Sequence, residues 1–343
     1  MRQRNDSRWG VWSKKILFKT RKMKHLDCFA GAGGFSLALK QAIEKVETIG
    51  FSEIDKFAIQ TYQKNFPWVP NFWDISKIDI ASLPEFDLLT WWFPCQDVSV
   101  AGKQSLEWWR TILVEYLLQM LEIKKPQYFV FENVKGLMSK KFTTFRNSIF
   151  DRIVEAGYEY DVAILNTRDF WIPQNRERVF IVWSYWNLDF EFPKWKELQV
   201  FLKDILECEV EEKFYLTAEQ IKSLANYDSN SRVYNTWWVA PTLNTCWWWH
   251  RQVKVWYSPR TREFWTTWWR NIVPTLSARD YKDAKYVTDW QKIRKCTPLE
   301  YERLQGFDDN WTEWVSNSQR YKQMWNAISI PPVREIFINL IKK

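Results

Sequence analysis

Short apolar runs alternate with helical patterns along the first 183 residues. Runs with the length and composition of buried strands lie at 25–29, 46–52, 86–90, 128–131, 160–165 and 179–182. Apolar residues at helical spacing lie between them, at 35–45, 55–65, 112–124 and 149–156. This alternation predicts an α/β fold, in which helices cover both faces of a mostly parallel sheet.

The pattern changes after about residue 184. Between 184 and 290 regular periodicity fades, and one weak repeat stands out. Residues 240–245 read Ala-Pro-Thr-Leu-Asn-Thr, and residues 273–278 read Val-Pro-Thr-Leu-Ser-Ala. A helical pattern returns at 298–305. We therefore predict a basic tail, a sheet domain, a smaller loop-rich domain and a C-terminal segment that completes the sheet domain, at 1–22, 23–183, 184–290 and 291–343.

Charge is concentrated at the start of the chain. The net charge is +8, and residues 1–22 hold eight Lys/Arg and one Asp, so the remaining residues carry only +1. A positive protein favours a polyanionic partner. The tail ends just before Met23, which predicts either that the native chain begins at Met23 or that the tail is a disordered basic arm.

Cysteine and hydropathy patterns narrow the class of protein. The five cysteines are scattered with no Cys-x-x-Cys pair, which argues against a disulfide framework or a zinc site and favours the reducing cytoplasm. No apolar run approaches the roughly 18 residues of a membrane span, and the start lacks the apolar core of a secretory signal. We expect neither a membrane partner nor a bound metal.

Four motifs follow one another along the chain. Residues 27–36 read Asp-Cys-Phe-Ala-Gly-Ala-Gly-Gly-Phe-Ser, 93–96 Phe-Pro-Cys-Gln, 131–134 Phe-Glu-Asn-Val, and 174–178 Gln-Asn-Arg-Glu-Arg. A glycine loop between a strand and a helix presents backbone N–H groups to a ligand, and Glu53, at the end of the next strand, suits ribose hydroxyls. Together the motifs resemble the DNA cytosine-5 methyltransferase family over about residues 24–342.

The resemblance implies a Rossmann-like sheet that binds S-adenosylmethionine and transfers its methyl group to C5 of a flipped-out cytosine in duplex DNA. Cys95 would be the nucleophile that adds to C6, because a cysteine activated by its surroundings is a strong nucleophile. Glu132 would stabilise charge at N3 of the base. Arg176 and Arg178, which alternate on a predicted strand and so share one face, would hold the base carbonyl and the flanking phosphate, or form surface salt bridges.

Further site residues follow from the same resemblance. Asp74 has two interpretations, an adenine contact or a helix N-cap. The region 184–290 would recognise the target sequence, or would be a plain insertion of loops. The implied cofactor-binding residues are Phe29, Ala30, Gly31, Gly33, Gly34, Glu53, Ile54, Asp74, Ile75 and Asn326. The implied DNA-binding residues are Gln96, Ser99, Gln174, Thr242, Leu243, Thr275 and Leu276.

The resemblance implies a monomer that acts on double-stranded DNA, of the restriction-modification or phage type, with a cognate restriction endonuclease as a further partner. Two alternatives stay open. A tRNA cytosine-5 methyltransferase would use the same motifs on RNA. An inactive nucleic-acid-binding remnant would follow if the tryptophans of this chain are genuine.

Tryptophan stands where the family has glycine. The chain has 25 Trp and only 9 Gly, whereas glycine is usually about 7% of residues. If fifteen of the tryptophans were glycine, the count would rise to 24 and become ordinary. We hypothesise that the gene uses UGA for glycine and that Trp311 is genuine. These fifteen, called the glycine-position tryptophans below, are residues 73, 91, 92, 108, 109, 171, 183, 237, 238, 247, 248, 249, 268, 269 and 325.

Overall fold

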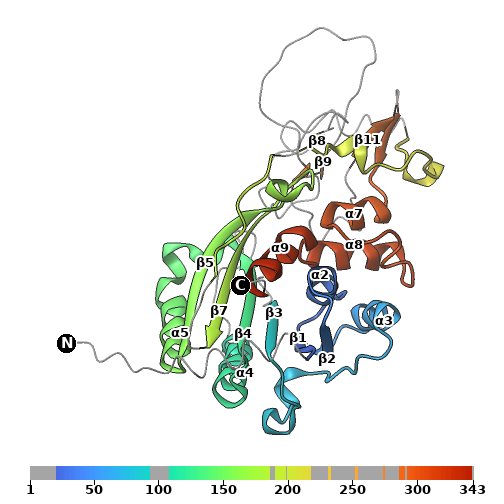
Figure 1. Cartoon of the computed structure of the whole chain (residues 1–343). Coiled ribbons are helices and arrows are strands. Elements are labelled where there is room, and N and C mark those ends of the chain that lie inside the picture. Colours follow the sequence, from blue (N-terminus) through green and yellow to red (C-terminus); the bar gives the residue numbers. More distant parts are fainter. Residues whose placement is uncertain are drawn as a thin grey trace.

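The computed structural model describes most of the sheet domain and of the C-terminal segment (Figure 1). The described residues are 21–92, 108–185, 190–197, 199–217, 231–232, 252–253, 273–274, 286–289 and 292–341. Several predicted site residues lie outside these ranges: Cys95, Gln96, Ser99, Thr242, Leu243, Thr275 and Leu276.

A six-stranded sheet forms the centre of the molecule, in the order β2-β1-β3-β4-β7-β5. Its strands are β1 (Met23–Cys28), β2 (Val46–Ser52), β3 (Leu88–Trp92), β4 (Tyr128–Val134), β5 (Tyr158–Asn166) and β7 (Glu177–Tyr185). The four strands from β2 to β4 pair in parallel, whereas β7 is antiparallel to both β4 and β5. The predicted α/β fold with a mostly parallel sheet is confirmed.

Helices cover both faces of this sheet, because alternate strand residues point to opposite sides. The described helices are α2 (Gly34–Ala42), α3 (Lys56–Asn65), α4 (Trp108–Lys124), α5 (Thr143–Glu155), α7 (Pro298–Gln305), α8 (Asn317–Asn326) and α9 (Ile330–Ile341). Leu88, Val130 and Val182 pack on one face against α2, α7, α8 and α9. Leu89, Phe129 and Ile181 pack on the other face against α4 and α5. Figure 1 shows the C-terminal helices beside α2.

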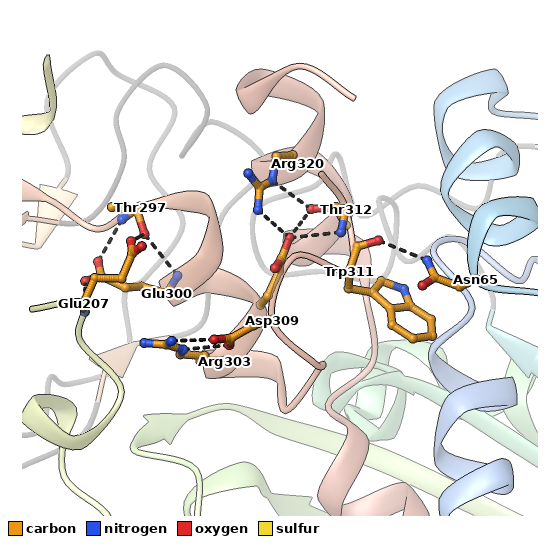
Figure 2. Close-up of polar contacts among 10 residues, drawn as sticks. Asn65, Glu207, Thr297, Glu300, Arg303, Asp309, Trp311, Thr312 and Arg320 are labelled. Carbon is orange, nitrogen blue, oxygen red and sulfur yellow. Dashed lines mark hydrogen bonds and ion pairs between the residues drawn. The ribbon is translucent and has the colours of Figure 1, made fainter. Parts of the chain in front are cut away.

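Polar contacts hold the C-terminal segment in place (Figure 2). Thr297 caps α7 in a capping box with Glu300 and also bonds Glu207. This links the segment 199–217 to α7. Trp311, in the loop after α7, accepts a hydrogen bond from Asn65 Nδ2 at 3.0 Å through its backbone oxygen. These contacts join parts of the chain that are far apart in sequence.

Short strand pairs complete the described structure. β11 (Tyr286–Asp289) is antiparallel to β12 (Lys292–Lys295), and β8 (Ser231–Arg232) is parallel to β9 (Gln252–Val253). β10 (Val273–Pro274), which directly precedes the predicted DNA-binding Thr275, pairs in parallel with β6 (Gln174–Asn175). This pairing brings the second copy of the sequence repeat to the Gln-Asn-Arg-Glu-Arg motif. The four-segment division itself stays a prediction.

Candidate active site

The loop between β1 and α2 is shaped by glycine. Gly31 and Gly33 have positive φ angles of 55° and 88°, a backbone region that L-residues with side chains adopt at a cost. Gly33 is also the N-cap of α2. A Cβ added to Gly31 would meet no atom within 4 Å, so the backbone of the loop is open to a ligand on this side. This geometry is consistent with a ligand-binding loop, a role that stays a prediction.

Glu53 fastens this loop to the end of β2. Its Oε2 accepts a hydrogen bond from the backbone N–H of Gly31 at 2.9 Å. Its Oε1 accepts hydrogen bonds from the backbone N–H groups of Ile54 and Asp55 at 2.8 and 2.9 Å. Two carboxylate oxygens offer about four acceptor positions. One acceptor position is therefore left for a ligand hydroxyl.

A cavity of about 120 Å³ lies against the loop, called the glycine-loop cavity below. Predicted cofactor-binding residues on its wall are Phe29, Ala30, Gly31, Gly34, Glu53 and Asn326. Sequence reasoning missed Asp55 and Lys322, which also line it and form an ion pair at 2.6 Å. No sequence pattern connects two residues so far apart along the chain.

The remaining predicted cofactor-binding residues do not line this cavity. Gly33 acts as a cap, Ile54 is exposed, and Ile75 is buried in the core beneath α4. Asp74 caps a 3-10 helix at Ile75–Lys77, where its side chain accepts from the Ser76 backbone N–H at 3.0 Å. Of the two interpretations of Asp74, the N-cap is the one present in the structure.

Glu132 lies inside β4, two residues before the strand ends, rather than at the end of a shorter strand as the pattern predicted. It is fully buried and pairs with Trp92, the last residue of β3, directly before the Phe-Pro-Cys-Gln motif. Burial raises the pKa of this carboxyl group, while the charges of Arg178 and Arg176 oppose the rise. Among the described residues neither carboxyl oxygen has a hydrogen-bond partner, although Arg178 forms an ion pair with the group. A buried carboxyl without a hydrogen bond is unusual, and a ligand base would supply one.

The two arginines do not lie on one strand, so the prediction of simple alternation is wrong, whereas their predicted roles at the base stay a prediction. β7 begins at Glu177, which leaves Arg176 between β6 and β7. Arg178 Nε lies 3.1 Å from Glu132 Oε1. Arg176 instead donates to the backbone oxygens of Ala327 and Trp325, at 2.7 and 3.3 Å. It therefore holds the turn between α8 and α9, next to the glycine-loop cavity.

Gln174 is fully buried, and neither atom of its side-chain amide has a hydrogen-bond partner in the part of the chain that the structure describes. Leaving such a group unsatisfied costs roughly 1–3 kcal/mol. Its neighbour in β10 is Val273. A buried amide beside both the arginine motif and the sequence repeat is consistent with its predicted role in DNA binding, which stays a prediction.

The glycine-position tryptophans occupy unusual places among the described residues. Trp73 and Trp171 have φ angles of 62° and 63°, a region that suits glycine. Trp91 and Trp183 are buried, yet neither indole N–H has a hydrogen-bond partner within the described ranges. Trp311, the predicted genuine tryptophan, donates from Nε1 to the Ala32 oxygen at 2.7 Å.

One glycine-position tryptophan reaches the predicted ligand site. Trp92 lines the glycine-loop cavity. Trp325, which directly precedes the predicted cofactor-binding Asn326, packs against the core and is not part of the wall. Pockets for small molecules usually measure about 300–1,000 Å³, so the cavity is in the expected place but is small.

The chain matches the family model described as C-5 cytosine-specific DNA methylase over residues 23–342. The chain belongs to this family. It is therefore a DNA cytosine-5 methyltransferase. It is 35% identical to the type II methyltransferase M1.ScrFI of Lactococcus lactis subsp. cremoris, over 93% of this chain and 78% of that protein. It is 34% identical to the type II methyltransferase M.NlaX of Neisseria lactamica, over 91% and 94%.

Solved structures of other methyltransferases share the fold. The crystal structure of the S. pombe Dnmt2 methyltransferase superposes with a TM-score of 0.70 at 18% identity, covering 94% of this chain and 99% of that one. Within the described part of the family domain, no group of side chains is arranged to hold a metal ion. No described helix is long and apolar enough to cross a membrane.

Proposed function

We propose that this methyltransferase uses S-adenosylmethionine, bound in the glycine-loop cavity, to modify one cytosine within a specific sequence of double-stranded DNA. The donor groups fit this ligand. Gly31 offers an open backbone, Glu53 has a carboxylate acceptor position left for ribose hydroxyls, and Asn326 adds a side-chain amide. When bound, the cofactor supplies an electrophilic methyl group.

The chain's own residues would activate the base. The Cys95 thiolate adds to C6 of a flipped-out cytosine, and C5 becomes nucleophilic as electron density moves into the ring. Glu132, whose raised pKa favours the protonated form, donates a hydrogen bond to N3 as negative charge develops there. Arg178, beside Glu132, keeps that carboxyl in position. After transfer, a base or solvent molecule removes the C5 proton, and Cys95 leaves C6.

The observation that carries this proposal is the buried Glu132 carboxyl. It forms an ion pair with Arg178 but has no hydrogen-bond partner among the described residues, and it lies beside the strand end from which the cysteine motif continues. Burying a carboxyl that lacks hydrogen bonds is costly, and a substrate base would supply one.

Duplex DNA is the proposed substrate, and modification within a restriction-modification or phage system is the proposed context. The curated relatives M1.ScrFI and M.NlaX carry type II methyltransferase names, and the long 184–290 region suits readout of a sequence. A monomer is proposed, because one chain carries all the motifs. A cognate restriction endonuclease is a further proposed partner, and a gene for one beside the methyltransferase gene would support it.

The test is transfer of a radiolabelled methyl group to duplex DNA, to tRNA, or to neither, followed by digestion to locate 5-methylcytosine. Label in DNA alone supports the proposal, and label in tRNA alone overturns the choice of substrate. Cys95→Ser should lower the rate of methyl transfer by at least about 10⁴-fold, while cofactor affinity stays within twofold. Full activity of Cys95→Ser would refute the covalent mechanism.

A further inference from the structure

A network of hydrogen bonds crosses the interior beneath the glycine-loop cavity and converges on Asp27. This residue is fully buried near the end of β1. Its two carboxylate oxygens accept hydrogen bonds from Thr90 Oγ1 and Ser36 Oγ, both at 2.8 Å. Behind these hydroxyls, Tyr62 Oη lies 2.7 Å from Ser36 Oγ, and His25 Nε2 lies 2.7 Å from Thr90 Oγ1.

The direction of every bond follows from counting hydrogens. A hydroxyl has one hydrogen, so Thr90, which gives it to Asp27, accepts from His25 Nε2–H. Burial lowers the pKa of His25 to about 3, so the ring is neutral and its Nδ1 accepts from Thr48 Oγ1 at 3.1 Å. By the same count Tyr62 donates to the serine hydroxyl. All donors therefore point toward one carboxylate.

The network joins the segments that form the cavity wall. Asp27 is followed within two residues by Phe29 and the glycine loop, and Ser36 lies in the first turn of α2. Thr90 lies two residues before Trp92, at the end of the strand that leads to the cysteine motif. Asp27 itself does not line the cavity, so any influence on a ligand is indirect.

We propose that ionised Asp27 is a positioning residue, which locks the glycine loop to the strand carrying the cysteine motif and thereby sets cofactor affinity. This rests on the proposed use of S-adenosylmethionine in the glycine-loop cavity. When the carboxyl is protonated, it must donate to one of the two hydroxyls. That arm of the network then reverses, and a charge-assisted bond becomes a weaker neutral one.

The charge state of Asp27 changes close to neutral pH. Burial raises its pKa to about 7 against the two hydroxyl bonds, and the charge of Glu53 adds to the rise. The other titratable groups that face it are neutral there: His25 has a lowered pKa, and burial raises the pKa of Cys28 and of Tyr62 well above their usual values. Cofactor affinity should therefore fall as the pH drops through about 7.

The folding stability that Asp27 contributes should change with pH in the direction opposite to cofactor affinity. The folded pKa of Asp27 is raised above its unfolded value near 3.8, so the folded state binds more protons between about pH 4 and 7. The contribution of this group to stability is fully present below pH 4 and is lost as the pH rises through 7. A merely structural group would change affinity and stability in the same direction.

The test compares Asp27→Asn with the wild-type full chain and with Thr48→Val, which removes only the outermost bond. Two quantities are measured from pH 6 to 9: the affinity for S-adenosylhomocysteine by calorimetry, and the amide hydrogen exchange of residues 28–36 in ligand-free protein. At pH 8, Asp27→Asn should weaken binding about tenfold, remove the pH step, and speed loop exchange, with Tm unchanged or higher. Thr48→Val should keep the fall in affinity as the pH drops through about 7.

The two readouts separate this inference from the proposed function. If wild-type protein does not bind S-adenosylhomocysteine at any pH but Asp27→Asn still speeds exchange of the loop, the cofactor proposal fails and the positioning role stands as a property of the loop. If loop exchange at pH 8 is the same in both proteins, the positioning role is wrong. Loss of affinity only in proportion to a lowered Tm would also overturn it.

Discussion

One side chain on the wall of the glycine-loop cavity, the Trp92 indole, narrows the space left for a ligand. Trp92 lines the glycine-loop cavity, whose 120 Å³ is below the usual size for a small-molecule site. Trp92→Gly should remove the indole from the wall and strengthen S-adenosylhomocysteine binding by about tenfold or more, as measured by calorimetry. Trp311→Gly is the matched control, because that indole is buried and bonded to Ala32.

The control should behave differently for a physical reason. Truncating a buried tryptophan of the core costs about 3–5 kcal/mol of unfolding free energy, so Trp311→Gly should be much less stable and gain no affinity. Weaker binding after Trp92→Gly, in a protein with an unchanged Tm, would mean that the indole belongs to the ligand site.

The codons of the natural gene test the origin of the tryptophans. Trp73 and Trp171 have left-handed backbones that glycine adopts without strain. We expect UGA at these two positions and at the other glycine-position tryptophans, with UGG at Trp311. Mass spectrometry of peptides from the native host should then show glycine at the UGA positions. UGG throughout would establish genuine tryptophans and favour the inactive alternative.

At the level of secondary-structure elements, Arg176 connects the end of β6 to the turn between α8 and α9. Its bond to Ala327 holds a wall residue of the cavity, and its bond to Trp325 holds the last turn of α8 beside that wall. Arg176→Ala should therefore weaken cofactor binding about tenfold, since charge-assisted hydrogen bonds contribute roughly 1.5–3 kcal/mol. Arg178→Ala should leave that affinity within twofold and lower kcat, because Arg178 contacts Glu132.

Two measurements distinguish these effects. A titration with cofactor gives the affinity, and single-turnover kinetics on duplex DNA give the rate of methyl transfer. Arg176→Lys is a useful intermediate, since it keeps the charge without the planar guanidinium. Equal loss of cofactor affinity in both alanine variants would contradict the division of roles between the arginines.

Elements were predictable where local signals are strong. The apolar pattern gave β2 with its observed bounds, and helix α7 begins after Thr297 with a capping box and a proline at its first turn. Helix α5 begins at Thr143, six residues before the predicted start, because its first turns are polar and lack a side-chain cap. Strand ends were also hard to predict at Arg176. Because β6 ends at Asn175 and β7 begins at Glu177, Arg176 is not part of a strand, and the alternation of side chains does not extend to it.

At the scale of the whole molecule, the motifs predicted the family and the order of the site, but not how distant residues meet. Lys322 reaches Asp55, and Trp311 reaches the oxygen of Ala32, across more than 260 residues of chain. Such contacts depend on how α8 packs against the sheet, which no local pattern encodes. The network at Asp27 was also invisible, since Thr90 and Ser36 are ordinary residues until the fold brings them together.

The distribution of charge leads to a last prediction for the whole molecule. Residues 1–22 carry +7 of the net +8, and Arg21 is bound to Asp87 with both nitrogen–oxygen distances at 2.6 Å. Deleting residues 1–20 spares that ion pair and removes a net five positive charges. Each neutralised phosphate contributes about 0.9 to the salt dependence of DNA binding. The slope of log affinity against log salt on nonspecific duplex DNA should therefore become shallower by about two to four, while cofactor affinity is unchanged.

Replacing the six Lys/Arg of residues 1–20 by Gln in the full chain should reproduce this shallower slope, because charge and not length is responsible. If the slope stays the same in both variants, the tail does not touch DNA, and phosphate contacts must come from local basic patches in residues 23–343, where the net charge is close to zero.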